Sequence, residues 1–152
     1  MLYCLPHGHS RMPIREHPRP GTILVCHFDG AFKEPEMVKT RCVIVLSPKI
    51  VRRAALCTVV CLSETPPDPI QQYHAQIDIR PPLPRPWNSD NIWIKGDMIY
   101  SVGFHRLDLI RLGKDHTGDR VYRMDVISEA QMKTAKNCVL RGLGLSTLTK
   151  HM

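Results

Sequence analysis

Residues 21–48, GTILVCHFDGAFKEPEMVKTRCVIVLSP, constrain the fold most, because two apolar runs in this stretch flank a long polar connection. The first run, residues 22–28, follows a Pro-Gly pair, and the second, residues 42–46, stops at Ser-Pro. Both are typical of buried strands. The 13-residue connection 29–41 is too long and polar for a tight hairpin, and such loops are usually functional or mobile. The pattern predicts a small β-barrel that handles an anion through Arg41.

Later segments predict more strands around this unit. Gly96 interrupts one strand-like region, which indicates a bend or a bulge. A polar turn at residues 115–119 predicts a hairpin, and a Pro-rich stretch at residues 81–86 predicts a polyproline-like crossing. The additional strand segments are residues 57–63, 73–79, 91–95 and 97–102, with residues 109–112 and 120–126 as the arms of the hairpin.

The last element is predicted to be a helix. Ser128 followed by Gln131 makes a capping box, and Gly142 stands where a C-terminal glycine is expected. The apolar side chains at helical spacing form one face, which we expect to close one side of the barrel. They are Met132, Ala135 and Val139.

The composition predicts one domain with an affinity for polyanions. A chain of 152 residues with 43% apolar residues can form a single core, and a net charge of +7 favours an acidic ligand, although a soluble surface rich in Arg would give the same charge. No apolar run approaches the length of a membrane span, and residues 1–20 resemble an extended basic arm rather than a signal peptide. We therefore expect a cytoplasmic protein without a membrane segment.

The cysteines predict packing rather than chemistry. Most of the six lie inside apolar runs, where a reduced thiol behaves as a small hydrophobic group. Cys4, His7 and His9 could supply metal ligands, but their spacing matches no familiar zinc pattern and no second pair accompanies them. The sequence predicts no metal site.

Three blocks in this order resemble the toxins of the MazF/PemK family. The first is Gly-x-Ile-x-x-x-x-Phe-Asp from Gly21, followed by Arg41 and then Val-Ile-Val-Leu-Ser-Pro; the second is residues 57–63 and the third residues 96–108. The resemblance implies a mainly β fold, an SH3-like, partly open barrel of the MazF/PemK type with a C-terminal helix. It places the domain at residues 21–142, after the arm at residues 1–20 and before a tail at residues 143–152.

The resemblance also implies an activity. Such a toxin of a type II toxin–antitoxin system is a sequence-selective endoribonuclease that cuts single-stranded mRNA without a metal or other cofactor, by attack of the 2′-hydroxyl on its own phosphodiester. Arg41 matches the catalytic Arg, and Ser63 matches a hydroxyl that can donate to the phosphate. Glu36 is a candidate base or a residue that positions Arg41. Of the candidate acids His27, His74 and His105, the last is preferred because it lies beside Arg106 and Asp108.

Basic residues near these blocks are expected to contact RNA, and a cognate antitoxin and a second copy of the chain are the expected partners. The expected RNA contacts are Lys33, Lys39, Arg52, Arg53 and Arg106. Alternative interpretations remain, because Tyr100 and Val102 stand where some of these toxins carry Arg and Asp. One is a non-catalytic nucleic-acid- or protein-binding module on the same barrel. Another is an Arg41 that only forms a salt bridge with Glu34 or Glu36, and a Ser63 that only forms a turn.

Overall fold

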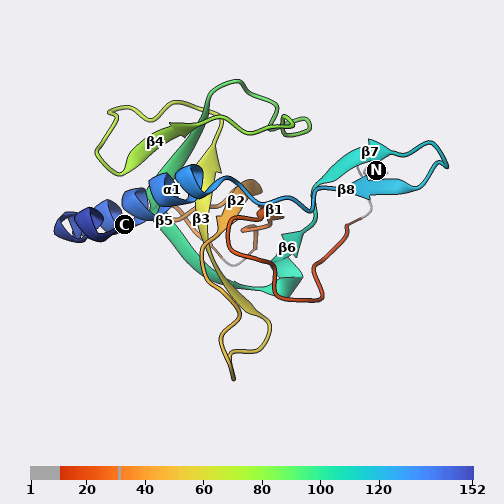
Figure 1. Cartoon of the computed structure of the whole chain (residues 1–152), viewed down its shortest axis with the longest axis horizontal. Helices are drawn as coiled ribbons and strands as arrows, with labels where there is room; N and C mark the ends of the chain where they lie inside the picture. Colours follow the sequence, from red (N-terminus) through yellow and green to blue (C-terminus); the bar gives the residue numbers. More distant parts are fainter. Residues whose placement is uncertain (1–10, 31) are drawn as a thin grey trace, which may run out of the picture.

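A computed structural model describes residues 11–30 and 32–152. This part of the chain contains eight strands, one α-helix and two 3-10 helices (Figure 1). The strands are β1 (Ile23–Cys26), β2 (Arg41–Val45), β3 (Leu56–Ser63), β4 (His74–Ile77), β5 (Ile92–Gly103), β6 (Leu107–Asp108), β7 (Arg111–Lys114) and β8 (Arg120–Tyr122). The helices are η1 (Phe104–Arg106), α1 (Glu129–Gly142) and η2 (Ser146–His151).

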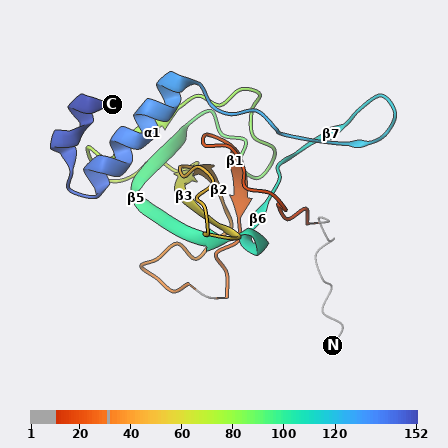
Figure 2. The same ribbon diagram turned by 60° about the horizontal axis from the view of Figure 1, so that its bottom comes forward.

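Six strands form one antiparallel sheet in the order β4-β5-β3-β2-β1-β6, and β7 pairs with β8 in a separate hairpin. The long strand β5 curves past β3 and continues through η1 into β6, which pairs with β1 at the far edge (Figure 2). The two edge strands, β4 and β6, do not pair with each other, so the barrel stays open. The predicted mainly β, SH3-like, partly open barrel with a C-terminal helix is confirmed.

The curvature of β5 has a local cause. Its register against β3 jumps from the pair Val60 and Ile99 to the pair Cys61 and Lys95, which leaves three residues of β5, including Gly96, without partners on β3. Such a bulge bends a strand and increases its twist. The predicted bend at Gly96 is confirmed, and the two segments around it form one strand.

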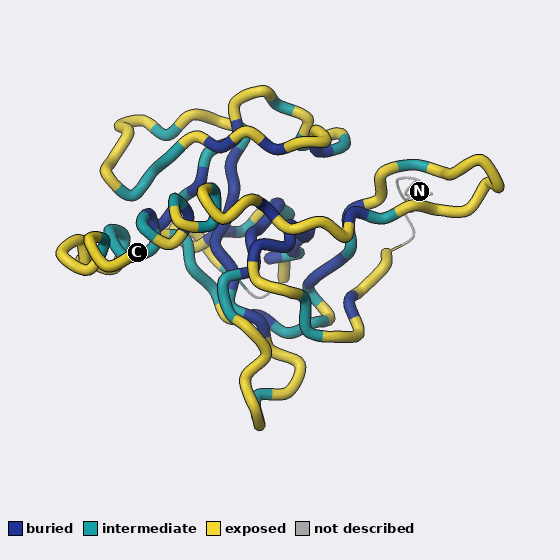
Figure 3. The backbone as a smooth tube through the Cα atoms, in the orientation of Figure 1, coloured by how far each residue is buried: buried dark blue, intermediate teal, exposed yellow. Residues whose placement is uncertain are grey.

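Residues of β2 alternate between two apolar clusters on opposite faces of the sheet. Cys42 and Ile44 face a cluster that includes Ala135 of α1, whereas Val43 and Val45 face the barrel interior. Buried residues accordingly concentrate in the sheet (Figure 3). This alternation follows from the two-residue period of a strand.

All five described cysteines are buried and unpaired, which confirms that they pack as small hydrophobic groups. Burial raises the pKa of the Cys26 thiol to about 12 and that of the Cys57 thiol to about 11. Cys4, His7 and His9 lie outside the described residues. The buried cysteines are Cys26, Cys42, Cys57, Cys61 and Cys138.

Helix α1 begins as predicted and ends differently. The Ser128 hydroxyl accepts a hydrogen bond from the Gln131 amide at 3.1 Å, and the Gln131 side chain accepts one from the Ser128 amide, so the capping box is confirmed. The prediction that Gly142 caps the end is wrong. Gly144, at φ +76°, takes the left-handed position, and its N–H and that of Leu145 bond back to the last turn.

Gly142 instead permits close packing, because it lies against the backbone of Gly96 in β5. A Cβ atom on either glycine would overlap the main chain of the other element. The missing side chains therefore let α1 approach the bulged part of β5 at backbone contact. The sheet and the helix that covers it meet at this pair.

The described part of the N-terminal arm lies along β6. Ile14 is buried, its amide donates to the Leu107 carbonyl at 3.0 Å, and the Leu109 amide donates to the Met12 carbonyl at 3.0 Å. The first ten residues of the predicted arm lie outside the described residues, and its boundary at residue 20 stays a prediction. Within residues 11–30 and 32–152, no helix combines the length and apolar character that crossing a bilayer requires.

Replacement of Gly142 by Ala should destabilise the fold although alanine favours helix. Overlap with the β5 backbone costs about 2–3 kcal/mol, since a main chain cannot move aside like a side chain. The gain in helix propensity is about 1 kcal/mol, so a net loss of about 1–2 kcal/mol is expected in urea unfolding. Lys136→Ala, at an exposed position of the same helix, is the control. A Gly142→Ala protein as stable as the parent would contradict the contact.

Candidate functional site

Arg41 opens β2, where β1 and β2 emerge from the long loop 27–40. Its Nη1 donates to Glu64 Oε1 at 2.9 Å, and the two side chains are 17% and 29% exposed. Arg41 Nε is buried and has no hydrogen-bond partner among the described residues. The alternative in which Arg41 pairs with Glu34 or Glu36 is wrong, because its partner is Glu64, directly after β3. The guanidinium is thus oriented by one carboxylate and keeps unused donors.

Arg41 lines an open groove of about 570 Å³, and residues 34–39 of the loop 27–40 form another part of its wall. Two further cations, Lys39 and Lys95, share it with the carboxylates of Glu34 and Glu36. The predicted Arg41, Glu36 and Lys39 are therefore brought together. Lys95 was not predicted, although its alternation with Ile94 in β5 places it on the face of the sheet opposite the helix-covered cluster.

The loop that covers this groove is pinned by aromatic residues. Tyr100 Oη accepts a hydrogen bond from the Met37 amide at 2.9 Å, and its ring contacts those of Phe28 and Phe32. Burial raises the pKa of Tyr100. Arg106 lies 5.2 Å from the centre of the Phe32 ring. These contacts tie Phe32 and Met37 of the loop to Tyr100 of β5.

Glu36 and Ser63 are both engaged locally. Glu36 Oε2 accepts a hydrogen bond from the Lys33 amide at 2.7 Å, which leaves its other oxygen without a hydrogen bond to a described residue. Ser63 is 7% exposed, and its hydroxyl donates to the Thr65 carbonyl and accepts from the Thr65 amide. The pairing of Val43 with Cys61, continued by two residues, places Ser63 beside Arg41. The hydroxyl is near the guanidinium but forms a turn.

The remaining predicted residues lie elsewhere. His105 is exposed on η1, and neither it nor Arg106 lines the groove. Arg106 instead donates to the His27 carbonyl at 2.9 Å. Arg52 and Arg53 lie in the loop after β2, at the end of that strand opposite Arg41, and the Arg53 guanidinium donates to Ser47 and Thr58 hydroxyls. Lys33 is exposed in the covering loop but is not part of the groove wall.

His74, the third candidate acid, is also occupied. Its Nδ1 accepts a hydrogen bond from the Gln71 amide at 3.0 Å. Burial lowers the pKa of His74, and the nearby carboxylate of Asp97 opposes that change. His74 belongs to the edge strand β4 rather than to the groove wall.

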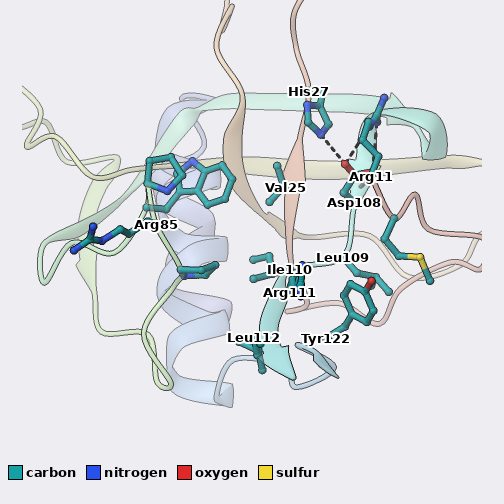
Figure 4. Close-up of a pocket in the computed structure, with 15 residues that line it drawn as sticks. Arg11, Val25, His27, Arg85, Asp108, Leu109, Ile110, Arg111, Leu112 and Tyr122 are labelled. Carbon is teal, nitrogen blue, oxygen red and sulfur yellow. Dashed lines mark hydrogen bonds and ion pairs between the residues drawn. The ribbon is translucent and has the colours of Figure 1, made fainter. Parts of the chain in front are cut away.

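A polar network around Asp108 was not predicted. Asp108 is buried in β6, and its Oδ2 lies 2.7 Å from His27 Nε2 and 3.1 Å from Arg11 Nε (Figure 4). The other ring nitrogen of His27 lies 3.3 Å from the Thr40 hydroxyl. This network links the arm, β1 and β6 to the residue before Arg41. The alternation of β1, which puts His27 on the face of Val25, was the available sequence signal.

A sequence model of the family described as "PemK-like, MazF-like toxin of type II toxin-antitoxin system" matches residues 19–141. The chain belongs to this family. The match spans all three blocks that resemble MazF/PemK toxins, together with the strand that begins at Arg41 and nearly all of α1.

Solved structures show the same fold. One is an endoribonuclease in complex with its cognate antitoxin from a mycobacterial species, with a TM-score of 0.50 and 18% identity over 84% of this chain and 94% of that chain. Another is the Mycobacterium tuberculosis toxin MazF-mt6, with a TM-score of 0.51 and 15% identity over 84% of this chain and 98% of that chain. A search among curated proteins found no match. These structural similarities support the open-barrel fold of this PemK/MazF-like protein.

Asp108→Asn should destabilise the protein because Asp108 accepts from two cationic or polar donors in a buried position. Asp108 is buried although Arg11 and His27 are partly exposed, and loss of such a charged acceptor costs about 1–3 kcal/mol. Urea unfolding at neutral pH measures this loss. Asp90→Asn, an exposed carboxylate without a described hydrogen bond, is the control and should change the stability by less than about 0.5 kcal/mol. Equal stabilities of the two variants would show that the network is energetically neutral.

Proposed function

We propose that this PemK/MazF-like protein is a ribonuclease toxin that cuts single-stranded RNA in the groove around Arg41. One observation carries the proposal: a partly buried Arg held by Glu64, with N–H donors that no described residue uses, shares a groove with Glu36, Lys39 and Lys95. A guanidinium can donate two parallel hydrogen bonds to phosphate oxygens and stays charged at every step. The groove thus combines an anion site with a candidate base.

In the proposed reaction, the 2′-oxygen of RNA attacks the adjacent phosphorus while the bond from phosphorus to the 5′-oxygen breaks. The products are a 2′,3′-cyclic phosphate and a free 5′-hydroxyl. Glu36 takes the 2′ proton, and solvent returns a proton to the leaving 5′-oxygen. Arg41 donates to the non-bridging oxygens as charge accumulates on them, assisted by Lys39 and Lys95. The proposed reaction uses only side chains of the protein and solvent, without a cofactor.

The proposal gives the other predicted residues no step in the proton transfers. Ser63 shapes the strand end beside Arg41, and its hydroxyl could reach a phosphate only by giving up its bonds to Thr65. His105 and Arg106 lie outside the groove, so the proposal assigns them no proton transfer. Lys33, Arg52 and Arg53 remain candidates for contacts with flanking RNA.

The protein is proposed to act in the cytoplasm as a homodimer whose activity a cognate antitoxin inhibits. One structure with the same fold is described as an endoribonuclease in complex with its cognate antitoxin. A net charge of +7 suits both RNA and an acidic inhibitor.

A non-catalytic RNA-binding module on the same barrel is the second candidate. It is favoured by two observations at positions where catalytic groups were expected. The Ser63 hydroxyl is used in a turn, and Tyr100, which stands where some toxins carry Arg, binds the covering loop instead. Fold alone does not decide between cleavage and binding.

Arg41→Ala should slow cleavage strongly. Purified protein and a long single-stranded RNA are incubated in EDTA, and the cut ends are mapped. The parent should leave 5′-hydroxyl ends, and the variant should lose about 10²–10³-fold in rate, the usual effect of removing a donor to a developing anion. Arg120→Ala, an exposed arginine of β8, should cut like the parent. Intact RNA with every folded protein would favour the binding module, and unchanged cleavage by Arg41→Ala would remove Arg41 from the centre.

Lys95→Met should weaken binding to the same extent for RNAs of different sequence. A cation that contacts phosphate contributes through counterion release, so the slope of log affinity against log salt should fall by about 1. Fluorescence anisotropy with a non-cleavable 2′-deoxy oligonucleotide at several salt concentrations measures the slope. Lys136→Met on the helix surface is the matched control. The same slope in parent and Lys95→Met would place RNA outside this groove.

A further inference from the structure

A second groove, of about 580 Å³, lies on the face of the sheet that also carries the helix-covered cluster. It runs between the Pro-rich loop 84–87 and the β7–β8 hairpin and ends at the Asp108 network (Figure 4). None of its lining residues also lines the groove around Arg41, so the proposed cleavage leaves it without a role. Small-molecule sites occupy roughly 300–1,000 Å³, and the volume of this groove suits a ligand of that class.

The middle of the groove offers mainly hydrocarbon to a ligand. The buried side chains of Val25 and Ile110 lie at its centre, and Trp87 and Leu112 flank them (Figure 4). Leu112 is 41% exposed and Met12, at the other end, is 42% exposed, so apolar surface continues along the whole groove. A sugar or a nucleotide would lose its hydrogen bonds to water there without replacing them. The middle of a fitting ligand is therefore apolar.

The rim of the groove carries positive charges that are available to a ligand. Arg85 and Arg111 are exposed there, and neither guanidinium has a hydrogen-bond or ion-pair partner among the described residues. The undescribed residues, 1–10 and 31, contain no Asp or Glu. Asp108, the one acidic residue among those lining the groove, already binds Arg11 and His27. The rim therefore favours an anionic group, and a second copy of this chain, with its charge of +7, is a poor fit.

Arg123 ties the two walls of the groove together. This buried side chain follows β8 and donates to the Pro81 carbonyl at 2.8 Å and to the Arg80 carbonyl at 3.1 Å. Its amide donates to the Ile110 carbonyl at 2.8 Å. Because a buried cation links the hairpin to the Pro-rich loop, the groove exists before any ligand arrives. Preformed sites of this kind lose less entropy on binding.

We propose that this groove binds a free fatty acid of medium chain length. Its unbranched hydrocarbon chain lies along the apolar middle, between Trp87 and Leu112, and its carboxylate lies at the rim. A guanidinium can donate two parallel hydrogen bonds to a carboxylate, so Arg85 or Arg111 can hold that end of the ligand. A charge at one end and none in the middle matches the order of surfaces in the groove. This inference goes beyond the proposed ribonuclease function and does not rest on it.

Isothermal titration calorimetry of the full chain with decanoate tests the proposal, at neutral pH and below the concentration at which decanoate forms micelles. Burial of each CH₂ group raises affinity up to about fourfold, so decanoate should bind about tenfold more tightly than octanoate, which is two CH₂ groups shorter. Decylamine, which has a similar chain and the opposite charge, should bind at least about tenfold more weakly than decanoate. These two comparisons separate the contribution of the chain from that of the carboxylate.

Two matched pairs of variants locate the ligand. Arg111→Glu should weaken decanoate binding about fivefold, because a repulsive charge replaces an attractive one, whereas Arg120→Glu on β8, outside the groove, should bind like the parent. Leu112→Asp should weaken it about tenfold, because a carboxylate then faces the chain, whereas Val121→Asp on the paired strand should have no effect. All four side chains are exposed, so each variant is expected to fold.

Several results would overturn the proposal. Absence of saturable binding, or equal affinities in parent, Arg111→Glu and Leu112→Asp, would leave the groove without this ligand. Equal affinity for decanoate and decylamine would remove the requirement for a carboxylate. Co-sedimentation of the parent, but not of Leu112→Asp, with vesicles of anionic phospholipid would make the groove a membrane contact, and displacement of decanoate by single-stranded RNA would make it an RNA site. Decanoate binding is measured without RNA, so an inactive parent in the EDTA assay would contradict only the proposed ribonuclease.

Discussion

The pairing of β3 with β5 carries the curvature on which both surfaces depend. Three unpaired residues at the bulge let β5 bend away from a flat sheet, and Gly96 within that bulge meets Gly142 of α1 at backbone contact. One strand thereby supports the helix on one face and the barrel interior on the other. Without this bend, β5 could not continue through η1 to reach β1 by way of β6.

The alternation of side chains along the strands places charged and apolar surfaces on opposite faces of the sheet. In β2, Arg41 and Val43 share the barrel face, whereas Cys42 faces the helix-covered cluster. Directly after β1, His27 lines the second groove together with Val25, whereas Cys26 between them pairs with Arg41 of β2. Two grooves of similar volume therefore lie on opposite faces, one lined by charged loop residues and the other by aromatic and aliphatic side chains.

Local patterns predicted the strands, the bend and the start of the helix, because each depends on neighbours in sequence. The contacts that define the site depend instead on register between distant segments. Glu64 reaches Arg41 only because β2 and β3 pair as they do, and Asp108 reaches His27 across 81 positions. The prediction for Gly142 failed for a related reason. Its position in the sequence suits a helix cap, but in the fold it packs against β5 within the last turn of α1, and Gly144 takes the left-handed position at the helix end.

The Arg41–Glu64 pair bears on how such a site can be both stable and reactive. A partly buried guanidinium without a partner would be costly, and Glu64 offsets part of that cost while using only one of five N–H donors. In the proposed reaction a phosphate need not displace Glu64, because the Nη2 group of Arg41 can still donate. The carboxylate then restricts the orientation of Arg41 before RNA binds, which reduces the reorganisation that stabilising the phosphorane requires. Arg85 and Arg111, exposed and without such a partner, are suited to attracting a ligand rather than to aligning one.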